Sequence, residues 1–150
     1  AETFGFVTPG QEEAEAPQDP YLELRLAVAE ETDLPVVPNW APDHLKLIGN
    51  VNIANRSNGT RIQATYDIND ARCTIRIQIY NTPPDIYTGV YQRDNSQYVE
   101  EYSVSDITHY LINNNGNVAA TWVNDNIEGL IQGNISMDDL KKMLNSIYEE

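Results

Sequence analysis

The sequence predicts an α+β fold, in which a curved antiparallel sheet of about six strands carries a C-terminal helix packed on one face. Three observations predict this class. Apolar and polar residues alternate along residues 60–68 and 72–80, which is typical of strands with one buried face. Asn-Gly pairs, which suit tight hairpin turns, occur at residues 58–59 and 115–116. A capped amphipathic segment follows residue 136.

Composition narrows the class of protein before any motif is considered. The chain has 150 residues and a net charge of −14, so its length suits one domain. This charge argues against nucleic acid and anionic membranes as partners, because both bind basic surfaces. No apolar run approaches the ~18 residues of a membrane span, so we expect no direct membrane insertion. The single cysteine, Cys73, excludes an intramolecular disulfide and a Cys-based zinc cluster.

The N-terminal part carries most of the excess charge. Residues 1–33 hold nine acids and one base. Residues 8–20 combine three prolines and four acids with no large apolar side chain, so they cannot bury enough surface to offset the entropy of ordering. We therefore predict an acidic flexible linker over residues 1–20 and a single domain over residues 21–150. The chain begins without Met and without a signal-peptide core, so we expect that a preceding segment was removed.

The first elements are predicted as a helix and an irregular connector. Residues 21–31 alternate as a strand would, yet their alanines and glutamates favour a helix, as does the four-residue spacing of Leu22 and Leu26. We favour the helix, ending before Pro35. Three prolines in residues 34–42 predict an extended or irregular connector.

Strands follow from Leu45. An interrupted alternation over residues 45–53 predicts the first, and two regular runs predict the next two. The predicted inward residues of those two runs are Ile62, Ala64, Tyr66, Ile68, Cys73, Ile75, Ile77 and Ile79. The predicted outward residues are Arg61, Gln63, Thr65, Asp67, Arg72, Thr74, Arg76 and Gln78.

The second half is predicted to return to the sheet and end in a helix. Residues 86–103 show no clear period, and strands are predicted at 104–113, 118–124 and 127–132. Ser136 and Asp139 form a capping-box pattern. The helix that follows has one apolar stripe, formed by Met137, Leu140, Leu144 and Ile147.

The residues that usually carry catalysis or metals lack supporting spacing. His44 and His109 have no H-x-x-x-H pattern and no nucleophile elbow, so we interpret both as ordinary surface or hydrogen-bonded histidines. Cys73 is interpreted as a small buried hydrophobe. The Asn/Asp-rich loops do not match a calcium-loop spacing and suit hairpin turns. We predict no catalytic residues, no metal site and no cofactor, and we rank a hydrolase third among the functions considered.

Tyrosines form the one cluster that suggests a binding surface. They recur between residues 80 and 110 among Asn, Gln and Asp, and Tyr offers an apolar ring with a polar tip. The alternative interpretation is that these rings cover the sheet where the chain crosses it. The predicted ligand-binding residues are Tyr87, Tyr91, Tyr98 and Tyr102.

The C-terminal third resembles a known bacterial family. The resemblance rests on the Trp122 strand, the run Ile131-Gln132-Gly133-Asn134-Ile135-Ser136, and a last helix with Leu140, Lys141, Lys142 and Ser146-Ile147. The segment Pro38-Asn39-Trp40-Ala41-Pro42-Asp43 resembles the family's opening, and the resemblance covers residues 34–150. The family is an uncharacterised extracytoplasmic domain, common in Firmicutes and often C-terminal to a membrane helix in anti-sigma-factor-like proteins. Its layout is also similar to that of lipoprotein-carrier folds.

The resemblance and the composition together give a functional expectation. We expect a non-enzymatic extracytoplasmic sensory or interaction domain, membrane-tethered through its acidic N-terminus or secreted, with an unknown protein or small-molecule partner. The alternative is a module that binds a lipid-like ligand or a sugar in a tyrosine-rich cleft.

Overall fold

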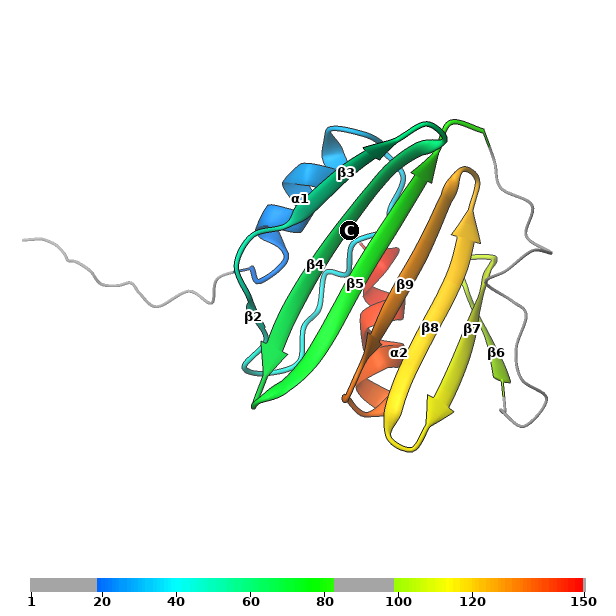
Figure 1. The fold of residues 1–150 in the computed structure, drawn as a ribbon. Helices are drawn as coiled ribbons and strands as arrows, with labels where there is room; N and C mark the ends of the chain where they lie inside the picture. The colour runs from blue at the N-terminus through cyan, green and yellow to red at the C-terminus, as the bar shows by residue number, and fades with distance from the viewer. Residues whose placement is uncertain (1–18, 83–98, 150) are drawn as a thin grey trace, which may run out of the picture.

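The structure is a computed structural model that describes residues 19–82 and 99–149 (Figure 1). It confirms the predicted α+β class, with an open antiparallel sheet and two helices. In chain order the elements are α1 (Leu22–Ala29), β2 (Lys46–Leu47), β3 (Asn52–Arg56), β4 (Gly59–Ile68), β5 (Ala71–Tyr80), β6 (Val99–Val104), β7 (Ile107–Asn114), β8 (Asn117–Asn124), β9 (Ile127–Gly133) and α2 (Met137–Ile147).

The sheet is assembled from two sequential groups of strands. Its order is β2-β4-β5-β9-β8-β7-β6, and β3 also pairs with β4, on the edge that β2 occupies (Figure 1). The chain therefore passes from β5 to the far edge at β6 and returns strand by strand until β9 lies antiparallel to β5. The pairing of β5 with β9 joins the two groups into one sheet.

Strands β4 and β5 confirm the predicted alternation. They pair over ten residues each, from Gly59 opposite Tyr80 to Ile68 opposite Ala71. The side chains predicted to face inward are buried, except that Ile68 is half-buried. Because successive strand residues point to opposite faces, the arginines of the same strands lie on the outer face.

The sheet has eight strands where the sequence indicates about six, for two reasons. The segment predicted as one strand over residues 45–53 is divided into β2 and β3, with Gly49 at φ 65° between them. The other added strand is β6, which lies in the stretch without a clear period. Ser105 and Asp106, both at positive φ, form a turn after it, so β7 begins at Ile107 rather than at residue 104. Short polar side chains tolerate this conformation.

Helix α1 forms as predicted, but it buries a different pair of residues. Leu24 and Val28 are buried, whereas Leu22 and Leu26 are 53% and 61% exposed. Residues four apart share a helix face, and residues two apart do not. The alternating apolar pattern therefore places half of its members in solvent once the segment is a helix.

Helix α2 begins with the predicted cap. The Ser136 hydroxyl accepts a hydrogen bond of 3.0 Å from the backbone N–H of Asp139. Leu140, Leu144 and Ile147 are buried as expected, while Met137 is half-buried. Met143 is also buried against the sheet.

Both helices cover the same face of the sheet. Their buried residues belong to one core with the inward residues of β4, β5, β8 and β9, α1 packing on β4 and α2 on β8 (Figure 1). Neither helix covers the opposite, outer face of the sheet. Within residues 19–82 and 99–149, no helix is long and apolar enough to span a membrane.

Candidate binding site

A pocket of about 600 Å³ opens where the start of α1 meets the proline-rich connector. It is lined by residues 19–21, Arg25 and residues 39–45. The connector cannot form helix or sheet because its prolines lack N–H donors and restrict the residues before them. Its backbone groups are therefore free to bond to side chains from both helices, and these bonds shape the pocket.

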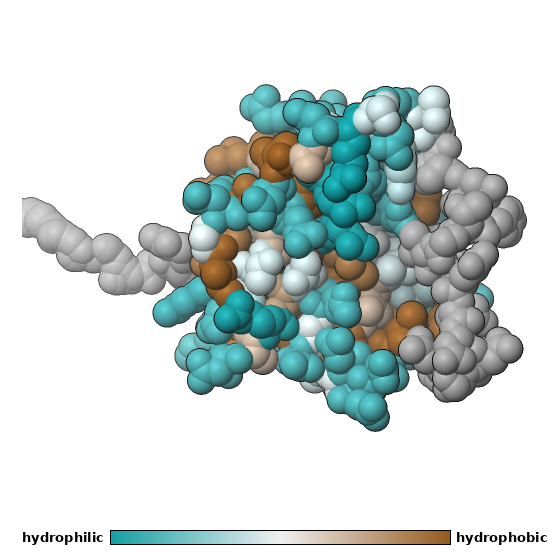
Figure 2. All heavy atoms as spheres, viewed as in Figure 1, coloured by the Kyte–Doolittle hydropathy of each residue, from teal (hydrophilic) through white to brown (hydrophobic). Residues whose placement is uncertain are grey.

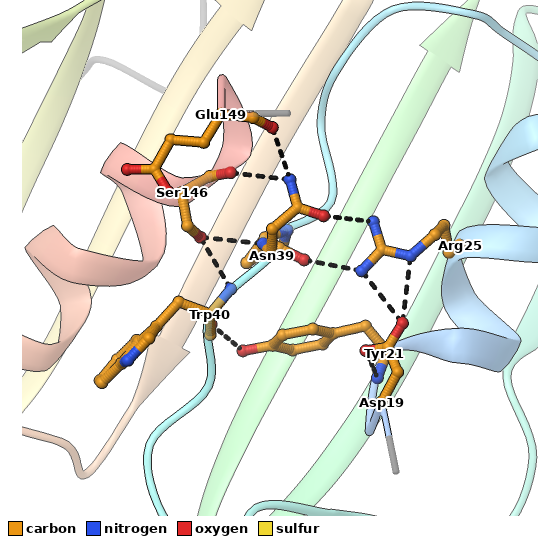
Figure 3. A network of polar contacts seen from close by, with 8 residues as sticks. Asp19, Tyr21, Arg25, Asn39, Trp40, Ser146 and Glu149 are labelled. Atoms are coloured by element: carbon orange, nitrogen blue, oxygen red, sulfur yellow. Dashed lines mark hydrogen bonds and ion pairs between the residues drawn. The ribbon is translucent and has the colours of Figure 1, made fainter. Parts of the chain in front are cut away.

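Arg25 is the centre of the polar network that forms one wall (Figure 3). Its guanidinium donates to the Asp19 carboxylate at 3.2 Å, to the Asn39 side-chain oxygen at 2.9 Å and to the Pro38 carbonyl at 3.0 Å. The contact with Asp19 is also an ion pair. The planar guanidinium suits several acceptors at fixed angles. Arg25 thus fixes α1 to the connector.

Asn39 and Ser146 connect the same wall to α2 (Figure 3). The buried Ser146 hydroxyl accepts the backbone N–H groups of Asn39 and Trp40 at 2.9 and 3.0 Å and donates to the Met143 carbonyl at 2.7 Å. The Asn39 amide donates to the carbonyls of Ser146 and Glu149 at 2.8 and 3.0 Å. The Asn39 amide thus bonds to one carbonyl in the last turn of α2 and to one just beyond its end.

Aromatic rings form the apolar part of the pocket. Tyr21 is buried, and its hydroxyl donates to the Trp40 carbonyl at 2.9 Å. Its ring meets Tyr66 edge-on, with centroids 5.8 Å apart. Burial and the nearby Cys73 raise the pKa of Tyr21, so its hydroxyl stays protonated. The Lys142 ammonium lies 5.3 Å from the centroid of the Trp40 ring, a cation–π contact that holds the indole in place.

The rim of the pocket carries exposed polar groups. Asp43 and His44 lie there side by side in sequence, and both are exposed. His44 has φ 71°, which is uncommon for a residue other than glycine and directs the chain into β2. The exposed position of His44 agrees with its interpretation as an ordinary surface histidine.

A second hollow of about 340 Å³ shares part of the same wall. It lies between the end of α1, residues 32–37 and the end of α2, and both Arg25 and Asn39 line it as well as the first pocket. The Arg25–Asn39 hydrogen bond therefore separates two neighbouring hollows. Movement of this pair would alter both.

Tyr102, one of the four tyrosines predicted to bind a ligand, lines neither of these hollows. Tyr87, Tyr91 and Tyr98 lie outside the described residues. Tyr102 is in β6 on the inner face, and its hydroxyl donates to the Asn145 side chain at 2.9 Å. The Lys141 ammonium lies 5.3 Å from its ring centroid and pairs with Glu100 at 2.9 Å. Tyr102 thus connects β6 to α2, and the proposed ligand role of the four tyrosines stays a prediction.

His109 is a buried structural histidine. One ring nitrogen, Nδ1, lies 3.1 Å from the Tyr102 carbonyl and the other, Nε2, lies 2.8 Å from the Tyr148 hydroxyl. The carbonyl requires a donor, so Nδ1 carries the proton and Nε2 accepts from Tyr148. Burial lowers the pKa of His109. The ring also packs 5.1 Å from the Trp122 ring, so both nitrogens and the ring face are engaged.

Cys73 lies where its strand pattern predicts. It is a buried free thiol on the inner face, and burial raises its pKa to about 12, so it remains a thiol at neutral pH. In the part of the chain that the structure describes, no three His, Cys, Asp or Glu side chains are grouped as a metal site would require.

Sequence reasoning missed Arg25 and Asn39 as pocket residues, although it singled out the Pro38–Asp43 segment. A tryptophan between prolines in a short connector was the available signal, because prolines keep the segment out of helix and sheet and Trp offers a large ring surface with a polar N–H. The partners of this segment lie about a dozen residues upstream in α1 and more than a hundred residues downstream in α2. No local periodicity links them.

The comparison with known families covers most of the fold. A family model described as "Domain of unknown function (DUF4367)" matches residues 35–147. No curated protein and no solved structure matches the chain. The matched span holds the pocket-forming part of the connector, every strand of the described sheet and α2, whereas α1 and its Arg25 precede it. The chain belongs to this family, the domain of unknown function DUF4367.

Proposed function

We propose that this chain is a non-enzymatic sensory or interaction domain that works outside the cytoplasm. Its acidic N-terminal segment serves as the tether, and its pocket between α1 and the connector receives a small ligand. From the sequence resemblance, we also propose that the domain is part of a bacterial membrane protein.

The observation that carries the proposal is the position of the pocket. Its lining includes Asp19 and Pro20, the last two residues of the predicted acidic linker, and Tyr21, the first residue of the predicted domain. The same wall reaches α2 through Asn39 and Ser146. A ligand that displaced Arg25 from Asp19 would alter the attachment of the N-terminal segment to the domain. A binding event at this place can therefore be transmitted to whatever the tether carries.

The chemistry of the lining suits a small polar ligand with one apolar face. The half-buried Trp40 offers ring surface, while Asp43 and His44 offer hydrogen-bonding groups on the rim. The Arg25 guanidinium is already bonded to three acceptors. Sugars combine an apolar ring face with several hydroxyl groups, so they are the ligand class that we propose.

The absence of serine, threonine and cysteine nucleophiles from the described lining favours a binding role. Among the described residues that line the pocket there is no serine, threonine or cysteine, and His44 therefore has no such hydroxyl or thiol to activate. The other histidine, His109, is buried with both ring nitrogens engaged. A domain of this kind would bind its ligand without turnover.

The ligand proposal is tested by NMR titration. The full chain is titrated with glucose, galactose and N-acetylglucosamine while the backbone amides of residues 19–21 and 39–45 and the Trp40 indole N–H are followed. We expect saturable shifts in these signals, weakened about tenfold or more in Asp43→Asn, because one well-placed polar contact is worth roughly 1.4 kcal/mol. Asp70→Asn, in the remote exposed β4–β5 turn, is the matched control. Shifts that do not saturate, or equal affinity in both variants, would contradict the proposal.

The proposed location outside the cytoplasm is tested with the gene sequence and with cell fractionation. The reading frame upstream of Ala1 should encode an export signal or a membrane helix, and cell fractionation should place the domain outside the cytoplasm. A frame without either feature would overturn the extracytoplasmic part of the proposal and leave the pocket proposal standing.

A further inference from the structure

The outer face of the sheet carries a second, smaller hollow that is unrelated to the pocket at α1. It has a volume of about 180 Å³, and its side chains come from β4, β5, β8 and β9. Figure 2 looks onto this face, where hydrophilic residues predominate. The residues used in the argument are Arg61, Arg76, Gln78, Thr121, Glu128 and Leu130. We call this hollow the outer groove.

Strand register explains why these side chains meet. Arg61, Gln78 and Glu128 lie opposite one another across β4, β5 and β9. Arg76, two residues before Gln78 on β5, pairs with Leu130 of β9, and Leu130 pairs with Thr121 of β8. Residues directly opposite, or two apart on one strand, share a face of the sheet. The two rows are therefore adjacent on the outer face.

Gln78 is the unusual member of the outer groove. It was predicted to face outward and does so, yet it is only 6% exposed. Its side-chain oxygen accepts from the Arg61 guanidinium at 3.1 Å, whereas its amide nitrogen is buried without a hydrogen-bond partner. Buried polar groups are almost always paired, and an unpaired one costs free energy. Gln78, a lining residue of the outer groove, therefore holds an unused donor.

The charges in the outer groove are also unbalanced. Neither Arg61 nor Arg76 forms an ion pair with any described residue. The one carboxylate in the lining, Glu128, already accepts a 2.6 Å hydrogen bond from the Tyr80 hydroxyl, and burial together with this bond raises the pKa of Tyr80 to about 12. Two guanidinium groups against one carboxylate leave one net positive charge in a chain whose net charge is −14.

We propose that the outer groove binds a single carboxylate group. Arginine forks match the planar geometry of a carboxylate, and the Gln78 amide and the Thr121 hydroxyl are further donors beside them. One net positive charge suits a monoanion, whereas a phosphate dianion would be repelled by Glu128. Leu130 offers an apolar surface for the carbon chain that bears the carboxylate.

The test is a titration of the full chain by NMR, following the Gln78 side-chain NH₂ signals at constant ionic strength. The probes are sodium acetate and the neutral-ended peptide acetyl-Gly-Glu-Gly-amide, with the Gln-containing peptide as the uncharged control. We expect saturable shifts with both carboxylates and none with the control peptide. Tighter binding of the peptide would assign the carboxylate to a protein partner, and equal or tighter binding of acetate would assign it to a free small acid.

Single substitutions inside and outside the outer groove test whether acetate binds there. Arg76→Gln should weaken acetate binding about tenfold or more, the effect of one lost charged contact. Arg72→Gln, on the same strand and face but outside the outer groove, should stay within about twofold of the unaltered chain, as a surface change away from the contact should. If Arg76→Gln does not fold, judged by its thermal melt, Thr121→Val takes its place with an expected loss of a few-fold.

Three results would overturn the proposal. They are shifts that grow linearly with acetate, equal affinity in Arg76→Gln (or its substitute) and Arg72→Gln, and tighter binding of inorganic phosphate than of acetate. None of these results depends on the pocket at α1, because that pocket lies on the opposite side of the sheet and shares no lining residue with the outer groove.

Discussion

Ser146→Ala is the substitution that most directly tests how the connector is held against α2. The buried Ser146 hydroxyl accepts two backbone N–H groups, those of Asn39 and Trp40, and donates to the carbonyl of Met143. Alanine removes the acceptor and keeps the helix. Both N–H groups then lose their partner at the point where the pocket wall meets the helix.

The magnitude follows from these contacts. A backbone donor left without a partner costs about 1–3 kcal/mol. Asn39 is exposed, so water can replace part of its bond, whereas Trp40 is half-buried and recovers less. Alanine returns roughly half a kcal/mol through its higher helix propensity. We therefore expect the free energy of unfolding to fall by about 2–4 kcal/mol, which corresponds to a decrease in Tm of roughly 4–16 °C for a domain of this size.

Urea unfolding, followed by tryptophan fluorescence and by circular dichroism, measures the change. The matched control is Ser103→Ala, because Ser103 is exposed and its hydroxyl makes one long contact of 3.4 Å with Thr108. The control should lose less than about 0.5 kcal/mol. If Ser146→Ala costs no more than Ser103→Ala, the hydroxyl does not hold the connector and the reasoning about the pocket wall is wrong.

Three further predictions concern the core. A Cβ at Gly129 would clash with the ring of Trp122, so Gly129→Ala should cost about 1–3 kcal/mol through overpacking; a urea midpoint equal to that of the unaltered chain would contradict this. Leu140→Ala should cost about 2–5 kcal/mol, because the residue is fully buried against the sheet; an unchanged melting curve would exclude the docking of α2. Burial lowers the pKa of His109. Below about pH 6.5 this histidine therefore binds a proton in the unfolded chain but not in the folded chain. As the pH falls through this range, the free energy of unfolding decreases by up to about 1.4 kcal/mol per pH unit. His109→Asn, which keeps a donor for the Tyr102 carbonyl, should flatten the pH dependence of the urea midpoint in that range, and a parallel pH profile would show that His109 is not responsible.

The strands β4 and β5 and the helix α2 could be predicted because their signals are local. In β4 and β5 the period of two is unbroken, and register then follows from the need to bury one face. For α2, Ser136 and Asp139 are three residues apart, and the apolar stripe repeats at helical spacing. Each of these features lies within a window of about a dozen residues, the range over which periodicity is informative.

Strand β6 and the inward residues of α1 could not be predicted in the same way. The inner face of β6 carries Glu100 and Tyr102, which are compatible with that position only because Lys141 and Asn145 of α2 lie opposite them. In α1, Leu22 with Leu26 and Leu24 with Val28 are two apolar pairs of the same four-residue spacing, so either could have faced the core. Packing on β4 decided that Leu24 and Val28, rather than Leu22 and Leu26, face the core.

The sequence alone determined the fold class, the faces of β4 and β5, the capped helix α2 and the acidic segment before the domain, because each depends on neighbours in the chain. Only the tertiary structure decided the two candidate binding sites. The pocket at α1 requires Arg25, Asn39 and Ser146 to meet across more than a hundred residues of chain. The outer groove requires β9 to lie beside β5, which places Glu128 next to Gln78. Pairings between distant segments are set by the packing of the whole sheet, and no local pattern of residues encodes them.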